Sequence, residues 1–363
     1  MKNTIGNSFT LTLFGESHGK AIGAVLDGVP SGVKVDECFI KAQMEKRKGI
    51  NSISTARREA DEVKILSGVF EGRTTGTPIC FMIENSDTKS KDYSLTKDLA
   101  RPGHADYTAE MRYGGFQDYR GGGHFSGRLT APLVAAGAVA ISMLKEKGIE
   151  IGTHISACGE IKDRDFENIN EDIKQLDELS FPVLCEKARE EMITYIEKVR
   201  SEGDSVGGTL TTAVTGMPAG VGEPWFDSVE GMLSHALFSV PGVKGVEFGK
   251  GFDFAFMKGS EANDEFRVAD GKIVTATNNN GGINGGITNG MPLMFTVAVK
   301  PTPSIYKQQN TVDFKKNENT SLIINGRHDP AIIHRARVVV DSVTALVLCD
   351  LLAMRFGTQF FGK

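Results

Sequence analysis

The 363-residue chain alternates between short apolar stretches and longer stretches with helical periodicity. The short stretches are rich in β-branched residues and are bounded by turn-forming residues, which predicts strands. They cover residues 8–15, 62–70, 77–85, 149–161, 207–217 and 291–301. Residues 36–48 and 185–203 instead repeat apolar side chains every three or four positions, which predicts amphipathic helices, and Gly203 is suited to end the second one.

Two further stretches predict helices that are buried on most sides. Residues 130–148 are apolar almost all round, with a proline near the start and a glycine just past the end. Their longest apolar run, residues 131–144, is too short to span a bilayer, so we expect a core helix. Residues 329–357 are the longest helix candidate, in which Asp329 suits the N-cap and Pro330 the first helical position.

The order of these elements indicates an α+β fold, because strands and helices interleave without the regular βαβ rhythm of a parallel sheet. Two polar stretches, residues 85–98 and 278–290, are rich in turn formers and are interpreted as loops. Neither has the composition of an interdomain linker, and the sequence contains no internal repeat. We therefore expect one domain that spans residues 1–363.

Composition narrows the class of protein. A net charge of −5 argues against a general nucleic-acid-binding surface, so any anion site must be a local cluster of arginines. Five cysteines without a C-x-x-C pair argue against a disulfide framework and a zinc ribbon, and fit a reducing compartment. The first residues lack the apolar stretch of a secretory signal. These features predict a cytoplasmic protein that binds neither nucleic acid nor membrane.

Five clusters of polar residues, each beside glycine or proline, are the candidates for chemistry. They occupy residues 15–19, 101–106, 120–128, 278–304 and 327–335. The third cluster precedes a predicted buried helix, and the free N–H groups of a helix N-terminus suit an anion. Arg120 and Arg128 would add forked donors for phosphate or carboxylate. The alternative is a glycine-rich corner without a ligand, since the cluster lacks the G-K-[ST] ending of a P-loop.

Histidines in this chain have both functional and structural interpretations. His18 lies in "GESHG", whose glycines either present it to a ligand or form an ordinary polar turn after a strand. His104 titrates near neutrality and is either an acid or base or a structural residue. Three others, His154, His235 and His334, fall inside predicted strands or helices and are interpreted as structural. No metal site is expected, because the usual ligand spacings are missing.

Taken in order, the motifs resemble one enzyme family. The stretches "FGESHGKAIG", "RPGHADYT", "DYRGGG", "GGINGGI", "VKPTPS" and "GRHDPAIIHRA" are among those that run from Ile5 to about Leu352 and resemble chorismate synthase. The resemblance implies a single α+β domain, with helices sandwiched between antiparallel sheets, in a homotetramer. It also implies a lyase of the shikimate pathway, which eliminates phosphate from 5-enolpyruvylshikimate 3-phosphate to form chorismate and requires reduced flavin mononucleotide (FMN).

The resemblance also assigns roles to individual residues. His18 would protonate the leaving phosphate, His104 would balance charge beside the flavin, and Asp329 would help to move the proton lost from the substrate ring. The anionic groups of the substrate would be bound by Ser17, Arg47, Arg101 and Arg128. Flavin contacts would come from His124, Phe125, Ser126, Gly285, Lys300, Pro301, Thr302, Pro303, Ser304 and Arg327.

The chain departs from the family pattern in two places. After the three glycines the family has an arginine where this chain has His124, so flavin contacts there are expected from backbone groups. Near Arg47 one basic residue is replaced by Ser52, which weakens that basic patch. Whether NADPH reduces the flavin on this protein stays open, and the lack of an inserted reductase-like segment favours a separate flavin reductase. The rival interpretations are a phosphate-binding transferase or phosphatase, and a flavin-binding module without chemistry.

Overall fold

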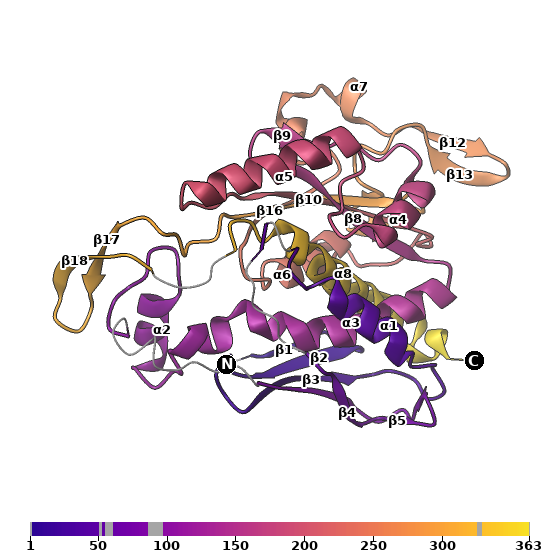
Figure 1. The fold of residues 1–363 in the computed structure, drawn as a ribbon. Coiled ribbons are helices and arrows are strands. Elements are labelled where there is room, and N and C mark those ends of the chain that lie inside the picture. The colour runs from indigo at the N-terminus through magenta and orange to yellow at the C-terminus, as the bar shows by residue number, and fades with distance from the viewer. Residues whose placement is uncertain (1, 51–52, 55–60, 86–96, 325–328, 363) are drawn as a thin grey trace.

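The computed structural model describes residues 2–50, 53–54, 61–85, 97–324 and 329–362. Within these residues, two five-stranded antiparallel sheets enclose a layer of helices, as Figure 1 shows. The α+β class and the arrangement of helices between antiparallel sheets are both confirmed.

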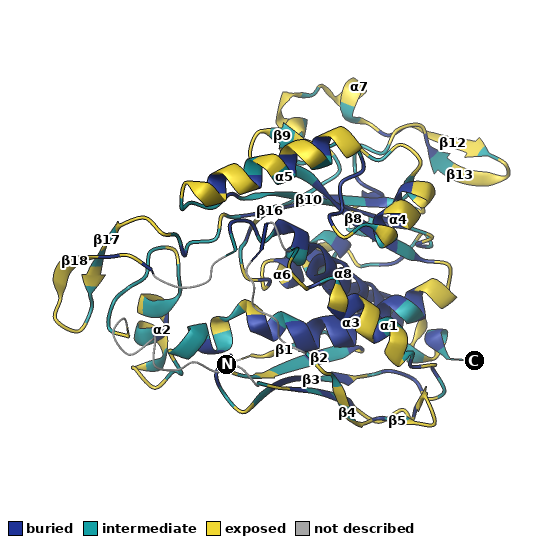
Figure 2. Ribbon diagram, in the orientation of Figure 1, coloured by how far each residue is buried: buried dark blue, intermediate teal, exposed yellow. Residues whose placement is uncertain are grey.

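The first sheet contains the N-terminal strands and has the order β1-β2-β3-β7-β4. Its strands are β1 (Thr4–Ile5), β2 (Thr10–Gly15), β3 (Ala21–Asp27), β7 (Ile79–Glu84) and β4 (Lys64–Ser67). Side chains on β7 alternate between the two faces of the sheet, so that Ile79, Phe81 and Ile83 are buried. The buried face lies against the helices, whereas the outer face is more exposed (Figure 2).

The predicted strand at residues 62–70 is not continuous. β4 ends at Ser67, and the residues that follow form β5 (Val69–Phe70), which pairs with β6 (Arg73–Thr74). The break lies at Gly68, which has a φ of +81°. A Cβ atom there would lie 2.7 Å from the Cα of Ile79, so the close approach of the two backbones requires glycine.

The second sheet has the order β11-β16-β10-β8-β9. Its strands are β11 (Val243–Phe248), β16 (Leu293–Val299), β10 (Gly208–Thr215), β8 (Glu150–Cys158) and β9 (Ile161–Lys162). The amphipathic helix α5 (Glu186–Ser201) covers its outer face (Figure 1). Gly203 follows with a φ of +70°, so the predicted end of this helix is confirmed.

Shorter elements flank the two sheets. They are α2 (Asp106–Tyr113), α4 (Ile169–Glu178), α7 (Gly259–Ala262), β12 (Phe266–Ala269), β13 (Lys272–Thr275), β14 (Ile283–Asn284), β15 (Ile287–Thr288), β17 (Gln309–Asp313) and β18 (Glu318–Leu322). The stretch 278–290, expected to be a loop, contains the small hairpin β14–β15. Its two strands are joined by a turn at Gly285 and Gly286, both of which have positive φ. Each strand has only two residues, which is too short for an alternating pattern to be recognised in the sequence.

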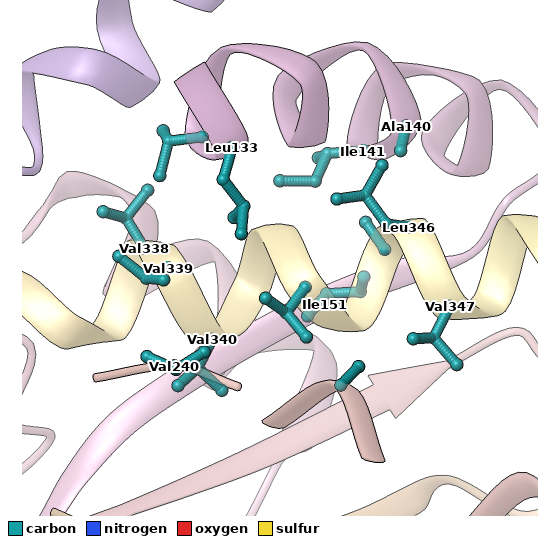
Figure 3. Close-up of a cluster of buried hydrophobic side chains, with 14 of the residues drawn as sticks. Leu133, Ala140, Ile141, Ile151, Val240, Val338, Val339, Val340, Leu346 and Val347 are labelled. Atoms are coloured by element: carbon teal, nitrogen blue, oxygen red, sulfur yellow. The ribbon is translucent and has the colours of Figure 1, made fainter. Parts of the chain in front are cut away.

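Four helices lie between the sheets: α1 (Glu37–Glu45), α3 (Thr130–Glu146), α6 (Val229–Leu237) and α8 (Ile333–Phe356). Figure 2 shows α3 and α8 buried along nearly their whole length, and Figure 3 shows their apolar side chains filling the space between them. Gly137 of α3 is essential to this packing, because a methyl group there would overlap the side chain of Ser342 on α8. Both predicted core helices are therefore confirmed.

One helix in the described part of the chain, residues 127–146, is long and apolar enough to cross a membrane by length and composition. Within this fold, 83% of its most apolar window is buried. The apolar surface of this helix is thus used by the protein core, between the two sheets.

The predicted N-cap of the C-terminal helix is wrong. α8 begins at Ile333 with Ile332 at the N-cap position and no side-chain cap. Asp329 and Pro330 precede the helix, and the carbonyl oxygen of Pro330 accepts a hydrogen bond from the backbone N–H of Val206 at 2.8 Å. This tertiary contact uses the carbonyl that a helix starting at Pro330 would need for its own first turn.

His334 is a buried, neutral histidine at the start of α8. Its Nε2 lies 2.9 Å from the Oγ of Ser54, and only 2% of the residue is exposed. Burial, followed by the nearby charge of Arg335, lowers the pKa of His334 to about 4. The burial of His334 and its contact with Ser54 agree with its interpretation as a structural residue.

We predict that His334 makes the fold acid-sensitive. Between pH 6.5 and about 4 the unfolded chain binds a proton at this histidine that the folded chain does not, so stability falls as the pH falls. The expected loss at pH 5 relative to pH 7 is about 2 kcal/mol from this group. Urea unfolding at the two pH values should therefore show a smaller decrease for His334→Gln than for the wild type. His235→Gln, at an exposed position, should keep the wild-type decrease, and an equal decrease in all three proteins would contradict the assignment.

Candidate active site

A cleft of about 1620 Å³ opens beside the starts of α3 and α8. Most of the predicted site residues line it, although they come from distant parts of the sequence. They are Arg47, Arg101, His104, His124, Phe125, Ser126, Arg128, Lys300, Pro301, Thr302, Pro303 and Asp329. The tertiary structure thus brings four of the five polar clusters to one place, and the remaining cluster, residues 15–19, lies directly behind them.

His18 is held in place by the glycine-rich loop that precedes α3. The backbone N–H of Ser17 donates to the carbonyl oxygen of Gly123 at 3.1 Å, and both Ser17 and His18 are buried. Gly121 adopts a φ of +59°, and a methyl group there would overlap the His18 imidazole. The absence of a side chain at Gly121, which itself lines the cleft, lets the backbone of the loop touch the imidazole.

His124, which replaces the arginine of the family pattern, belongs to the same glycine-rich loop and contacts the end of β2. Its Nδ1 lies 2.7 Å from the carbonyl oxygen of Gly15. Since a carbonyl only accepts, Nδ1 carries the hydrogen, and in the neutral ring Nε2 is an acceptor. His124 therefore ties the glycine-rich loop to the end of β2, next to His18.

His104 is positioned by the segment that follows β16. Its Nε2 lies 2.7 Å from the Oγ of Ser304, and the Nζ of Lys300 donates to the carbonyl oxygen of Gly103 at 2.6 Å. Gly103 has a φ of +71°, and a Cβ there would lie 2.8 Å from the Cβ of Pro303. Residues 101–106 and 300–304 therefore form one unit, in which Ser304 is buried behind the cleft lining.

The predicted substrate-binding arginines are already paired with carboxylates. Arg101 binds Asp106 through two parallel contacts, Nε to Oδ2 at 2.9 Å and Nη2 to Oδ1 at 2.7 Å. Asp61 pairs with both of the others, accepting from Arg47 at 2.9 Å and from Nη1 of Arg128. These contacts orient the guanidinium groups before any ligand binds.

Burial and neighbouring charges act in opposite directions on Arg47. Desolvation lowers its pKa to about 10, with Arg335 and Arg128 adding to the decrease, while Asp61 opposes it. Arg47 is therefore still protonated at neutral pH. Asp61 was not identified from the sequence, because nothing in "RREADEV" marks this acid as the partner of two distant arginines.

Asp329 reaches the same cluster through a third arginine. Nη1 of Arg335 forms an ion pair with Oδ2 of Asp329, and Nε of Arg335 donates to the carbonyl oxygen of Arg47 at 2.8 Å. Nη2 of Arg47 donates to the Oγ1 of Thr130 at 3.1 Å. The start of α8 and the start of α3 therefore meet at Arg47. Arg335 ends the fifth polar cluster of the sequence, residues 327–335, and the resemblance assigns it no role.

A few predicted site residues lie elsewhere. Gly285 does not line the cleft; it lies in the β14–β15 turn, where the carbonyl of Gly286 accepts from the N–H of Val229 at the start of α6. Arg327 and Ser52 lie outside the described residues. His235, interpreted from the sequence as structural, is exposed on α6 and lines the cleft.

The described part of the cleft has the character of an anion site. Three arginines, Arg47, Arg128 and Arg335, face two carboxylates, those of Asp61 and Asp329, which leaves an excess of positive charge. The starts of α3 and α8 add the positive ends of two helix dipoles. Among the described residues, no group of three His, Cys, Asp or Glu side chains is arranged to hold a metal ion. The arrangement can bind an anion beside several groups able to transfer protons.

Comparisons with known proteins agree with this picture. The family profile of chorismate synthase matches residues 9–353. The chorismate synthase of Pyrococcus abyssi is 47% identical over 350 residues, which cover 96% of this chain and 97% of that protein. The chorismate synthase of Dehalococcoides mccartyi is 46% identical over 360 residues, which cover 98% of each.

A solved crystal structure of a chorismate synthase has the same fold. It superimposes with a TM-score of 0.75 at 29% sequence identity, over 97% of this chain and 94% of that one. With the profile match over most of the length, and with relatives nearly half identical from end to end, the chain belongs to the chorismate synthase family of lyases in the shikimate pathway.

Proposed function

We propose that this protein eliminates phosphate from 5-enolpyruvylshikimate 3-phosphate to form chorismate, in a 1,4-elimination that requires reduced FMN. The observation that carries the proposal is the composition of the cleft described above. Buried arginines and Asp329 line it together with the glycine-rich loop, and His104 is fixed against residues 300–304. Family membership supports the formation of chorismate. Most of the residues proposed for the steps below line the cleft, whereas His18 and Ser17 are buried behind its lining.

The arginines match the charges of the substrate. The substrate has two carboxylates and a phosphate, and the planar fork of a guanidinium binds such groups better than an ammonium does. Arg47, Arg101 and Arg128 line the cleft with their carboxylate partners behind them. Ser17, buried beside His18, would be a further contact to the substrate.

The residues present also fit a flavin. The volume of about 1620 Å³ exceeds that of a pocket for one small ligand, roughly 300–1,000 Å³, so it has room for a cofactor and a substrate together. Residues 300–303 and 124–126 line this space and would hold FMN, with Gly285 and Arg327 as further expected contacts. Reduced FMN, when bound, supplies electron density to the substrate as phosphate leaves and recovers it afterwards.

The protein's own groups would move the protons. His18 would hydrogen-bond or protonate the bridging oxygen of the leaving phosphate, which makes phosphate a better leaving group. His104, fixed by Ser304, would stand beside the flavin ring and balance its charge. Asp329 would take up the proton that leaves the substrate ring. Its carboxylate is held at the cleft by the ion pair with Arg335.

The source of electrons and the assembly are further parts of the proposal. We expect a separate flavin reductase to supply reduced FMN. NADPH would serve only to reduce the flavin and would take no part in the elimination. We also expect a homotetramer. Large aromatic side chains at the surface support self-association, since Trp225 is 85%, Phe226 92% and Phe256 88% exposed in the single chain.

We predict that phosphate release requires FMN in its reduced form. An anaerobic assay with chemically reduced FMN and no NADPH should give chorismate and phosphate in equal amounts, because each elimination releases one phosphate. Reduced FMN is required because the cleft residues alone supply no electrons. Oxidised FMN is the control and should give no product. Equal turnover without flavin, or turnover that depends on a metal ion, would favour the rival phosphatase or transferase.

We predict that His18→Ala and His104→Ala each lower turnover by roughly 10²–10⁴, the range for a lost acid or base. Ser304→Ala should cause a smaller loss, because it removes only the partner that orients His104. Single-turnover measurements with saturating reduced FMN test this, with flavin binding followed by fluorescence. Near wild-type turnover in both histidine variants would show that these roles are wrong.

We predict that Gly121→Ala impairs turnover far more than Gly122→Ala. Both glycines have positive φ, +59° and +83°, so alanine strains the backbone at either position. Only at Gly121 would the new methyl group overlap the His18 ring. We expect at least a tenfold larger loss of kcat for Gly121→Ala, at the order of magnitude of a misplaced catalytic group. Equal losses would mean that strain alone, and not the position of His18, limits the reaction.

A further inference from the structure

Arg335 contacts both Asp329, the proposed proton acceptor, and Arg47, a proposed substrate-binding residue. It holds the carboxylate of Asp329 with Nη1 and the backbone carbonyl of Arg47 with Nε. We propose that Arg335 is a positioning residue, which fixes the Asp329 carboxylate at a set distance and orientation from the substrate-binding Arg47. This inference rests on the proposed function, in which Asp329 accepts the proton from the substrate ring.

The position of Arg335 in α8 explains why its side chain reaches Asp329. It is the third residue of the helix, which begins at Ile333. Long side chains in an α-helix point back toward the helix N-terminus, and the chain that enters α8 carries Asp329 there. The guanidinium therefore spans from the first turn of the helix to the segment before it.

The two contacts use the shape of the guanidinium. Its nitrogens lie in one plane and leave in different directions, so one side chain can hold a carboxylate and a carbonyl at once. The Asp329 side chain is 10% exposed and that of Arg335 is 35% exposed, which places the carboxylate inside and the guanidinium at the cleft wall. A lysine at this position would have a single nitrogen in place of the separate Nη1 and Nε that hold the two acceptors.

The neighbouring charges make Arg335 the link between two ion pairs. Arg47 pairs with Asp61, and Asp61 also pairs with Arg128. Through the Arg47 backbone, Arg335 ties Asp329 to this cluster. A shift of about 1 Å in a catalytic group can cost on the order of 10²-fold in rate, so loss of this link should slow the chemical step.

Steady-state kinetics of Arg335→Gln and Arg335→Lys with saturating reduced FMN test the proposal. We expect kcat to fall by about 10²-fold in Arg335→Gln and by about tenfold in Arg335→Lys, with the KM for substrate within about threefold of wild type. Arg355→Gln is the matched control, since Arg355 lies on the same helix and donates to a backbone carbonyl outside the cleft. It should keep wild-type kcat.

A double-mutant cycle with Asp329→Asn provides the second readout. If Arg335 acts through Asp329, Arg335→Gln should cost little more once Asp329→Asn is present. Fully additive losses, a raised KM with unchanged kcat, or wild-type kinetics in Arg335→Gln would each overturn the proposal. If Arg335→Gln does not fold, Arg335→Lys decides by its kcat at unchanged KM. A wild-type protein that makes no chorismate would instead refute the proposed function.

Discussion

The close packing of α3 against α8 is the constraint on which the rest of this structure depends. Gly137 allows the two helices to touch at Ser342, and further along the carbonyl of Ala140 accepts from the thiol of Cys349 at 3.7 Å. The later residue of α3 contacts the later residue of α8, so the two helices run in the same direction. Their N-termini therefore lie at the same end of the core, and the cleft forms there.

The arrangement of charge follows from that geometry. Thr130 at the start of α3 and Arg335 near the start of α8 both bind Arg47, which is buried between them. Three arginines close together would repel one another, and burial makes each charge more costly. Asp61 and Asp329 pair with these arginines and fix them in place, and Arg47 keeps a pKa of about 10 although burial lowers it.

Histidines at the cleft are held by groups from distant segments. The Nε2 of His104 contacts Ser304, 200 residues further along the chain, and His124 contacts the carbonyl of Gly15, 109 residues before it. Each contact leaves the imidazole in one orientation, which catalytic groups require and which a flexible surface histidine would lack. Gly103 makes the first of these approaches possible, because a Cβ atom there would crowd Pro303. Gly121 does the same for His18, whose imidazole touches the backbone of the glycine-rich loop.

The sequence by itself determined much of the secondary structure and the candidate chemistry. Periodicity located β2, β4, β7, β8, β10 and β16 and the helices α1, α3, α5 and α8, because alternation and three-to-four spacing report which local face is buried. It did not locate β3, β11 or α6. Clusters of arginine, histidine and glycine marked most of the candidate site residues that line the cleft, and their order along the chain indicated the family.

Only the tertiary structure decided how those residues act together. Asp61 pairs with Arg128, 67 residues away, and no local pattern indicates which of many acids will neutralise a buried arginine. The start of α8 also shifted from Pro330 to Ile333, because Val206 from another segment takes the Pro330 carbonyl. Local sequence reports propensity and burial, whereas counter-ions and helix ends depend on groups that meet only after the chain has folded.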